Sequence, residues 1–599
     1  MKLHSTFCAL LFTFAALHPS FGQSDKRLKG VDKDLNSILE ATKAPGFAVA
    51  VVQGDQVIYA RGFGYRDYEN KVPMDANTLL AIGSCSKAFT SAIMGQLRDK
   101  ELLSFDDSPI DHIPELRFFN ETLNAQVNIR DLMSHQTGIP RHDFSWYLFP
   151  TFNRDSLIMR IKHQEPFTGL RQKWNYNNFM FLVQGVIAER ISGKSWEDNI
   201  RERFFVPLGM DRSNVSIAEL EQSENAALGY ELHNKTEVRK MDYYKIAAMA
   251  PAGSINSSVN DMAKWLIVWL NKGKYQDEQI LPEIYVNEAM SSQAVIGAGL
   301  PDPPFDDMFL ANYGYGWMIS SYRGHYRVEH GGNIDGFSAS TSFFPSDDLG
   351  IVVLANQNGS AVPSLVRNTI ADRMLQSERT NWAEHFASEN VTLNILEEPD
   401  TTAQRPVAPP SHPLEDYLGN YGHPGYGDFE VASNADSLFA IFPLKKFYLK
   451  HLYYDVFEPF EVTKYGIDTT DTSPIKFNFT TGITGEIRTV TSQIEPALQD
   501  PISFKRQPKY IQVKLAELEP YAGEYMIAGT AIKVYTKADE SLYMFVPGQP
   551  EYKLTPTGEN TFGISNLEGY SARFEKDTNG EVKEIVLIQP NGTFRAQKQ

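Results

Sequence analysis

Ser84 and Lys87 stand three residues apart at the start of a predicted helix. Phe89, Ile93 and Leu97 follow at helical spacing and form one apolar stripe. We therefore expect the serine and the lysine to lie one turn apart on the same helix face. Free backbone N–H groups at a helix N-terminus favour developing negative charge. A hydroxyl beside an amine in that position can be activated without a histidine, so Ser84 is a candidate nucleophile.

The Ser-x-x-Lys spacing alone is weak evidence, because so short a motif recurs by chance. Ser473 and Lys476 match it too, in a β-rich segment that has no helical stripe. In the competing structural interpretation, Ser84 caps the helix and Lys87 is a solvated lysine of its first turn. The choice between the two interpretations depends on the other motifs in the chain.

A second motif is Tyr176-Asn177-Asn178, which precedes a predicted apolar helix over residues 179–191. A phenol beside a buried ammonium can have a lowered pKa and can shuttle protons. The amide of Asn178 could hold Lys87 or a substrate carbonyl. A tripeptide of the same type recurs at residues 68–70, and a lone Tyr-x-Asn is most often a turn at a helix start.

A third motif, His330-Gly331-Gly332-Asn333, lies between two strand-like runs. Two adjacent glycines at a strand edge allow a ligand backbone to approach closely. The N–H of Asn333 could then join that of Ser84 in an oxyanion hole. The alternative is a glycine-rich hairpin end that carries a surface histidine.

The three motifs, in this order, resemble those of the class C β-lactamases. They also resemble those of the related DD-peptidases, D-aminopeptidases and esterases, the S12-type serine hydrolases. Residues 128–140, 251–255 and 313–317 are similar to further stretches of that family, so the resemblance spans about residues 30–375. It implies an α/β (α+β) fold in which an antiparallel sheet flanked by helices adjoins a mostly helical lobe. The resemblance places the site where the sheet meets the lobe.

The same resemblance implies a role for each motif. Ser84 would be the nucleophile, with Lys87 and Tyr176 as the general acid/base pair. The implied substrate-binding residues are Asn178, His330, Gly332 and Asn333. Neither a metal nor a cofactor is implied. The partner would be a small-molecule or peptide substrate.

One departure affects the expected substrate. β-Lactamases usually have lysine where this chain has His330, which is largely neutral at pH 7. A neutral group weakens the case for an anionic β-lactam. We therefore expect D-amino-acid-containing peptides or peptidoglycan fragments first, small esters second and β-lactams third.

Two further hypotheses fall outside this ranking. A penicillin-binding sensor that acylates without turnover would keep every motif residue. An α/β-hydrolase elbow at residues 336–340 is disfavoured, because its last position is serine and no helix follows it.

Composition agrees with an exported enzyme. A net charge of −18 argues against a nucleic-acid partner, which would need basic patches. Residues 1–22 have the pattern of a signal peptide, which predicts a periplasmic or extracellular protein, and no later stretch predicts a transmembrane segment. After its removal Cys85 is the only cysteine, and we interpret it as a packing residue.

Three regions follow the signal peptide. We predict the hydrolase domain at residues 25–389 and a proline-rich linker at 390–412. Two modules, residues 413–508 and 512–599, share an internal repeat and are rich in short alternating strands, so each is predicted to be a small β-barrel, lipocalin-like in type. A packing, substrate-gating or assembly role is favoured, which includes a homo-oligomer through these modules. Carbohydrate or cell-wall binding is the main competing role.

Overall fold

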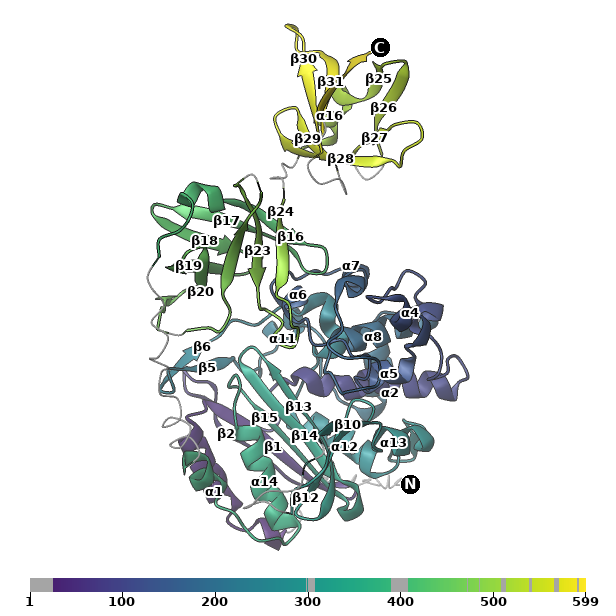
Figure 1. The fold of residues 1–599 in the computed structure, drawn as a ribbon. Helices are drawn as coiled ribbons and strands as arrows, with labels where there is room; N and C mark the ends of the chain where they lie inside the picture. The colour runs from purple at the N-terminus through teal and green to yellow at the C-terminus, as the bar shows by residue number, and fades with distance from the viewer. Residues whose placement is uncertain are drawn as a thin grey trace, which may run out of the picture. The chain divides into compact units, whose positions relative to one another are not determined.

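The computed structural model describes residues 25–599 except 298, 300–306, 389–407, 471, 484, 508–512, 538–540, 565–569 and 590–591 (Figure 1). The predicted signal peptide and most of the predicted linker therefore lie outside the described residues. The chain divides into two compact units. One is Met1–Trp146 with Pro150–Thr401, and the other is Tyr147–Phe149 with Thr402–Gln599.

The first unit is built around an antiparallel sheet with the strand order β10-β11-β12-β13-β14-β15-β1-β2-β3. Strands from the two ends of the unit meet at its centre, where Val49 pairs with Val353. The strands are β1 (Gly46–Gln53), β2 (Gln56–Asp67), β3 (Val72–Pro73), β10 (Ala294–Gly297), β11 (Ala311–Tyr313), β12 (Met318–Tyr322), β13 (His325–Ile334), β14 (Phe337–Phe344) and β15 (Leu349–Ala355). Every residue of β14 and β15 is buried, which requires cover on both faces of the sheet.

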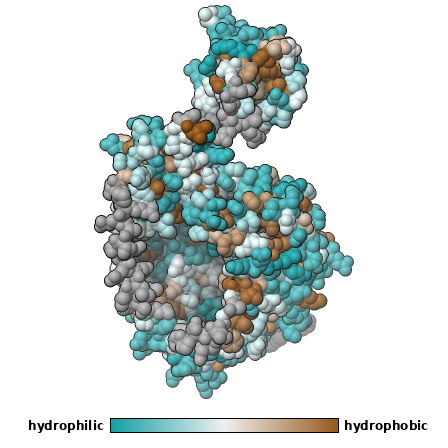
Figure 2. Space-filling model, in the orientation of Figure 1, coloured by the Kyte–Doolittle hydropathy of each residue, from teal (hydrophilic) through white to brown (hydrophobic). Residues whose placement is uncertain are grey.

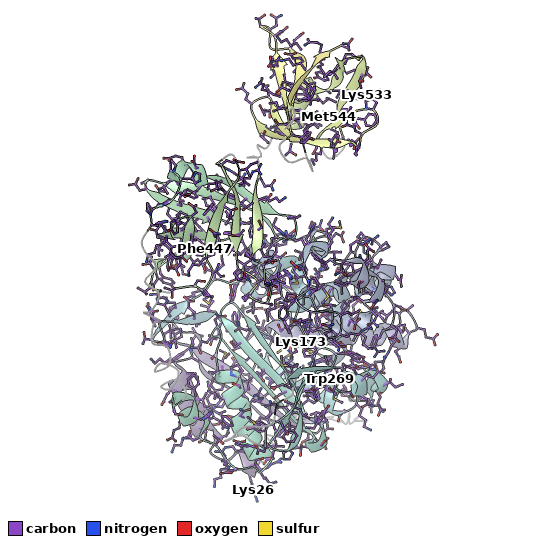
Figure 3. The ribbon with its side chains drawn as sticks, in the orientation of Figure 1. Lys26, Lys173, Trp269, Phe447, Lys533 and Met544 are labelled. Carbon is purple, nitrogen blue, oxygen red and sulfur yellow. The ribbon has the colours of Figure 1, made fainter. Side chains whose placement is uncertain are left out.

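Helices cover the two faces. On one face, α1 (Val31–Thr42) and α14 (Val362–Met374) share a core with Ile351 and Val353 (Figure 1). On the other, α12 (Val259–Leu270) places Leu266 against Gly350, the neighbour of Ile351 in β15. Successive strand residues point to opposite faces, so these contacts define a helix–sheet–helix stack. Trp269 of α12, labelled in Figure 3, packs against Trp317 with ring centroids 5.1 Å apart.

The helical lobe is centred on α2 (Ser86–Asp99) and α8 (Phe179–Ser192). Ser91 of α2 donates a hydrogen bond to Gln184 of α8 at 2.9 Å, within a buried contact. The structure ends α8 at Gly193, whose φ of +68° suits glycine. The shorter helices of the unit include α3 (Pro109–His112), α4 (Glu121–Gln126), α5 (Ile129–Met133), α6 (Phe144–Tyr147), α7 (Arg154–Ile158), α9 (Trp196–Ile200), α10 (Val206–Leu208), α11 (Ile217–Glu221) and α13 (Glu283–Ala289). Its short strands are β4 (Leu80–Ala81), β5 (Tyr230–His233), β6 (Glu237–Lys240), β7 (Asn256–Ser257), β8 (Lys274–Tyr275) and β9 (Glu278–Gln279).

The second unit contains the two predicted barrels. In the first, pairing of β19 with β20 closes a sheet of order β19-β18-β17-β16-β24-β23-β22-β20, with β21 attached to β20. Strands β25 to β32 close the second, preceded by α16 (Leu515–Leu518). The strands are β16 (Gly419–His423), β17 (Gly427–Asn434), β18 (Ser437–Ile441), β19 (Lys446–Tyr453), β20 (Val456–Thr463), β21 (Gly466–Ile467), β22 (Phe477–Thr481), β23 (Ile487–Ser492), β24 (Ile502–Gln507), β25 (Gly523–Ile527), β26 (Thr530–Thr536), β27 (Leu542–Phe545), β28 (Tyr552–Gly558), β29 (Thr561–Ile564), β30 (Ser571–Lys576), β31 (Val582–Gln589) and β32 (Gly592–Lys598).

The internal repeat reappears as a repeated contact in the two barrels. Tyr421 donates its hydroxyl hydrogen bond to the Tyr417 carbonyl at 2.9 Å. Tyr525 donates in the same way to the Tyr521 carbonyl at 2.7 Å. Phe149 lies among the aromatic rings of the first barrel, 5.3 Å from Phe442 between centroids.

The described surface has a mixed polarity. On the face drawn in Figure 2, hydrophobic residues form small groups among hydrophilic ones. Within the described ranges, no helix has the length and apolar character needed to cross a membrane.

Candidate active site

Ser84 lies in a tight turn immediately before α2. The turn is a short 3-10 helix, Gly83–Cys85, and Gly83 has a φ of +51°. A methyl group added at Gly83 would lie 3.0 Å from the backbone nitrogen of Asn333, and one added at Gly332 would lie 1.9 Å from the carbonyl oxygen of Ile82. Glycine at both positions therefore lets β13 contact the serine turn. This contact unites the first and third motifs.

Lys87 is fully buried beside the serine. Its Nζ lies 3.0 Å from Ser84 Oγ and donates a hydrogen bond to the carbonyl of Ala252 at 2.7 Å. The rings of Tyr176 and Phe181 surround it, with centroids 4.9 Å and 5.4 Å from Nζ. Burial, reinforced by the nearby Arg141 charge, holds the pKa of Lys87 well below its ordinary value. A neutral amine beside the hydroxyl can accept its proton.

Tyr176 completes the group around the nucleophile. Its hydroxyl donates a hydrogen bond to Ser84 Oγ at 2.8 Å. Burial raises the pKa of Tyr176 above the ordinary tyrosine value, against smaller lowering effects of the Ser84 hydrogen bond and Arg141. The sequence predicted a lowered pKa for this phenol, and the direction is opposite because burial outweighs the neighbouring charges. Tyr176 thus remains a protonated donor.

Asn178 does not make the first of the two contacts expected of it, which was with Lys87. Its Nδ2 donates to Asp143 Oδ1 at 2.8 Å rather than holding Lys87. Trp146 Nε1 donates to the same oxygen at 2.9 Å. The other Asp143 oxygen accepts a bond from Arg141 Nε at 2.6 Å, and the guanidinium lies over the Tyr176 ring, 4.8 Å from its centroid. Asn178 therefore holds the Asp143 carboxylate in place. That carboxylate in turn holds the Arg141 guanidinium over the Tyr176 ring.

His330 is only 1% exposed, so it is not the surface histidine of the alternative interpretation. Its Nε2 lies 3.0 Å from the Tyr313 hydroxyl and its Nδ1 lies 2.6 Å from the Gly331 carbonyl oxygen. Burial lowers the pKa of His330 to about 4, with Lys87 as the next cause. The imidazole is thus neutral near pH 7, and protein groups engage both of its nitrogens.

Sequence reasoning assigned no role to several residues that surround the site. His135 is buried and packs against Tyr176 with ring centroids 4.4 Å apart. Its Nδ1 accepts a hydrogen bond from the Asn177 backbone. Arg141 and Asp143 form the ion pair described above. Residues 128–140 were identified only as a family-like stretch, and nothing in their spacing indicated that the segment would pass beside Tyr176.

Cys85 and the second Ser-x-x-Lys match both lack the features of a reactive group. The buried Cys85 thiol donates to the His330 carbonyl at 3.1 Å, and burial raises its pKa to about 11. Lys476 contacts the Glu458 carboxylate at 2.6 Å, while the Ser473 hydroxyl accepts a bond from the backbone of Ile475. Lys476 therefore has a carboxylate as its partner, whereas neither hydrogen bond of Lys87 goes to a carboxylate.

Two family models match the chain. One is described as beta-lactamase and matches residues 31–374. The other is described as a domain of unknown function, DUF3471, and matches residues 403–506.

Similar proteins include two enzymes named unguisins hydrolases. The one from Aspergillus campestris is 28% identical over 438 residues, 67% of this chain and 78% of the relative. The one from Aspergillus violaceofuscus is 25% identical over 439 residues, 67% of this chain and 76% of the relative. Protein flp of Staphylococcus aureus strain N315 is 25% identical over 340 residues, 56% of this chain and 65% of that protein.

A solved structure shares the fold. It is the octameric penicillin-binding protein homologue from Pyrococcus abyssi, with a TM-score of 0.53 and 21% sequence identity. The match covers 79% of this chain and 100% of that chain. At this identity the likeness concerns the fold alone.

Proposed function

Because the chain belongs to the β-lactamase family, we propose that it is a serine hydrolase that forms an acyl-enzyme on Ser84. The observation that carries the proposal is the position of Lys87, buried without a carboxylate partner in its two hydrogen bonds and 3.0 Å from the Ser84 hydroxyl. A lysine that served only the fold would more easily be charged, paired or solvated. Relatives named as hydrolases support the same class of reaction.

The proposed reaction begins with attack of Ser84 Oγ on a substrate carbonyl carbon. Lys87 Nζ accepts the hydroxyl proton as the new C–O bond forms. The backbone N–H groups of Ser84 and Asn333 hold the negative oxygen of the tetrahedral intermediate. Tyr176 lies within reach to pass a proton to the leaving group, and the proton on Lys87 replaces it.

Water then attacks the acyl-enzyme, with Lys87 and Tyr176 again accepting and returning protons. Turnover separates this proposal from the penicillin-binding sensor. We expect a chromogenic ester to give a burst equal to the enzyme concentration, followed by a steady rate. A burst with no later product, together with a stable acyl adduct in the intact mass, would identify a sensor.

We place the substrate among D-amino-acid-containing peptides or peptidoglycan fragments, with esters next and β-lactams third. His330 is neutral near pH 7, because its pKa is about 4, so it does not supply a cation. Arg141 supplies a cation instead. Its side chain is 56% exposed, and Asp143 orients it above the Tyr176 ring. Its charge favours a substrate with a carboxylate near the leaving group.

Replacing Arg141 by glutamine is expected to lower kcat/KM for a dipeptide with a free C-terminal carboxylate by about 10-fold, with a smaller effect on its amide. The preference for the carboxylate should persist from pH 7 to pH 9, since a guanidinium remains charged there. Arg61→Gln is the matched control, because Arg61 is 57% exposed and also pairs with an aspartate, Asp32. Equal losses on carboxylate and amide would exclude Arg141 as the carboxylate site.

Export and assembly belong to the proposal as well. The signal-like residues 1–22 favour a periplasmic or extracellular location. The Pyrococcus abyssi homologue is described as octameric, which supports assembly of this chain into a homo-oligomer. We assign the two β-barrels to assembly or substrate gating.

A further inference from the structure

A cavity of about 430 Å³ lies in the first unit, beside α11 and the 3-10 helix Ala247–Ala252. Its volume falls within the range of small-ligand pockets. Most of its lining side chains are apolar, and these include Phe152, Val215, Ile217, Ile246 and Ala248. Phe152 is 84% exposed, so this large ring meets solvent. An apolar cavity with an exposed aromatic residue favours an apolar ligand.

Ser254 is a buried, uncharged polar residue in the wall of this cavity. Its side chain is 6% exposed, and its hydroxyl has no hydrogen-bond partner among the described residues. A buried hydroxyl without a partner costs free energy, which a bound group with one polar atom would recover. Ser254 therefore indicates a ligand rather than an empty packing defect.

The Ser254 segment runs directly beside the nucleophile turn. Ala252 accepts the hydrogen bond from Lys87, and Ala81 pairs with Asn256 across β4 and β7. A methyl group added at Gly253 would lie 3.5 Å from the carbonyl carbon of Gly83, the residue before the nucleophile. Part of the cavity wall is thus formed by the segment that contacts Lys87 and the turn before Ser84.

A second, smaller hollow indicates the direction of approach. It is lined by Gly253, Ser254 and Ile246, and also by Ile334, which follows Asn333 in β13. Tyr176 lines neither space. Since the leaving group must approach Tyr176 for its proton, the cavity lies toward the acyl portion of the substrate.

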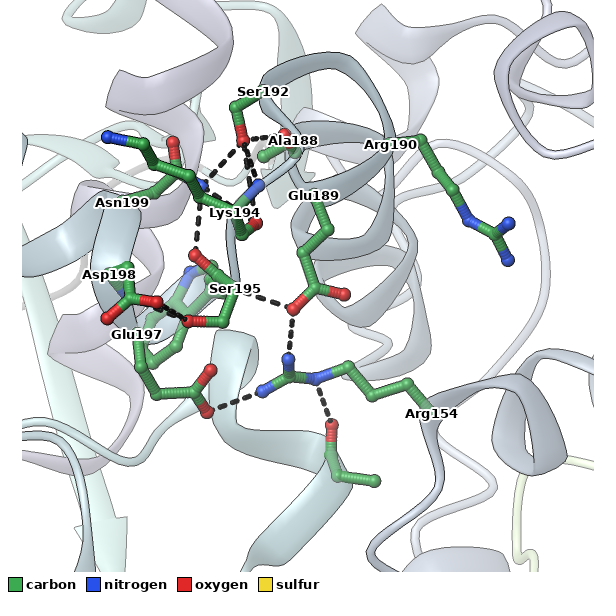
Figure 4. A network of polar contacts seen from close by, with 12 residues as sticks. Arg154, Ala188, Glu189, Arg190, Ser192, Lys194, Ser195, Glu197, Asp198 and Asn199 are labelled. Atoms are coloured by element: carbon green, nitrogen blue, oxygen red, sulfur yellow. Dashed lines mark hydrogen bonds and ion pairs between the residues drawn. The ribbon is translucent and has the colours of Figure 1, made fainter.

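Charges of both signs line the cavity wall, where Arg154 and Lys245 are matched in number by Glu197 and Glu221. Arg154 donates to Ala248 at 3.3 Å, contacts Glu197 at 2.6 Å and also contacts Glu189 (Figure 4). Glu189 in turn accepts a bond from the Trp196 backbone at 2.8 Å. A guanidinium shared by two carboxylates and a carbonyl does not attract a further anion. The wall therefore favours an uncharged ligand.

We propose that this cavity binds a bulky, uncharged apolar group on the acyl side of the substrate, with one polar atom that bonds Ser254. The inference rests on the proposed acyl transfer at Ser84 and narrows its substrate class. A peptide with a large apolar residue before the scissile carbonyl fits this description, as does an ester of a medium-chain acid.

A series of p-nitrophenyl esters from acetate to octanoate tests the proposal on the full-length protein. We expect kcat/KM to rise with acyl length, by up to about fourfold per methylene that enters the cavity. Ala218→Trp, which adds bulk at the cavity lining, should lower kcat/KM for octanoate at least about 10-fold and leave acetate within about twofold. Gln222→Trp is the matched control, since Gln222 follows the same helix and is exposed outside the lining.

The outcomes separate this inference from the proposed function. Acetate hydrolysis with no gain from a longer acyl chain in the wild-type protein would overturn the cavity assignment and leave acyl transfer intact. A gain that follows the length of the alcohol instead would overturn the acyl-side assignment. Absence of hydrolysis on every ester, with no labelling of Ser84, would contradict the proposed function itself. The wild-type series remains decisive if Ala218→Trp does not fold.

Discussion

The Ser84→Ala variant is expected to lose covalent labelling by a fluorophosphonate probe and to hydrolyse esters at least about 10³-fold more slowly. The hydroxyl lies 2.8 Å from the Tyr176 hydroxyl and 3.0 Å from Lys87 Nζ, so its removal deletes the only atom of the group that would form the covalent bond. Intact-mass spectrometry after probe treatment measures the labelling, and initial rates measure the turnover.

The chain supplies the control for this variant. Ser473 also precedes a lysine by three residues, but Lys476 pairs with Glu458 instead of the serine hydroxyl. Ser473→Ala should keep both labelling and turnover. A labelled Ser84→Ala protein would refute Ser84 as the nucleophile. An unlabelled Ser473→Ala protein would mean that the nucleophile is Ser473 in the first barrel.

The predicted family and fold are confirmed. They could be predicted because each motif requires a particular local backbone geometry. Ser84 and Lys87 sit one turn apart because local helix geometry fixes their separation. The glycines of the third motif also predict a close backbone contact. A side chain at Gly332 would clash with the carbonyl oxygen of Ile82. The repeated tyrosines likewise predict two similar barrels, and strands β16 to β32 form them.

Other parts of the site depend on contacts that no local pattern encodes. The pKa of Tyr176 is set by its burial, which arises from His135 and Trp174 packed around its ring. The partner of Asn178 is Asp143, 35 residues away in the chain. Such side chains converge only when α8 and the preceding loop are placed in space. Charge and burial at the site could therefore not be predicted from spacing.

His330 and Arg141 show that the charge at the site could not be predicted from the motifs either. The sequence correctly predicted that His330 is neutral, but its neutrality comes from burial and from partners at both ring nitrogens. A cation is nevertheless present, because Arg141 lies in the loop just before α6. A motif specifies which residue type stands at a position, whereas the field at the nucleophile sums over every nearby charge.

Replacing Lys87 by methionine is expected to slow acylation by at least about 10³-fold while the protein remains folded. Methionine nearly matches the lysine stem in volume, and the loss of one hydrogen bond to Ala252 costs about 1 kcal/mol. Removal of the buried amine also removes its desolvation penalty, which offsets that cost. Stopped-flow acylation and the melting temperature are the two measurements. Equal losses of rate and stability would instead indicate a structural lysine.

Two further variants and a pH profile define the role of the amine. Lys87→Arg keeps a positive charge but supplies no base at neutral pH, so it should be as slow as the methionine variant. Lys476→Met should acylate at the wild-type rate. Because the pKa of Lys87 lies well below the ordinary 10.5, its neutral form predominates at pH values where an exposed lysine is protonated. The wild-type acylation rate should therefore rise with pH and reach its plateau well below pH 10.5. A rise centred at that ordinary value, or full activity in Lys87→Arg, would mean that Lys87 acts as a fixed charge and that the proton from Ser84 leaves by another group.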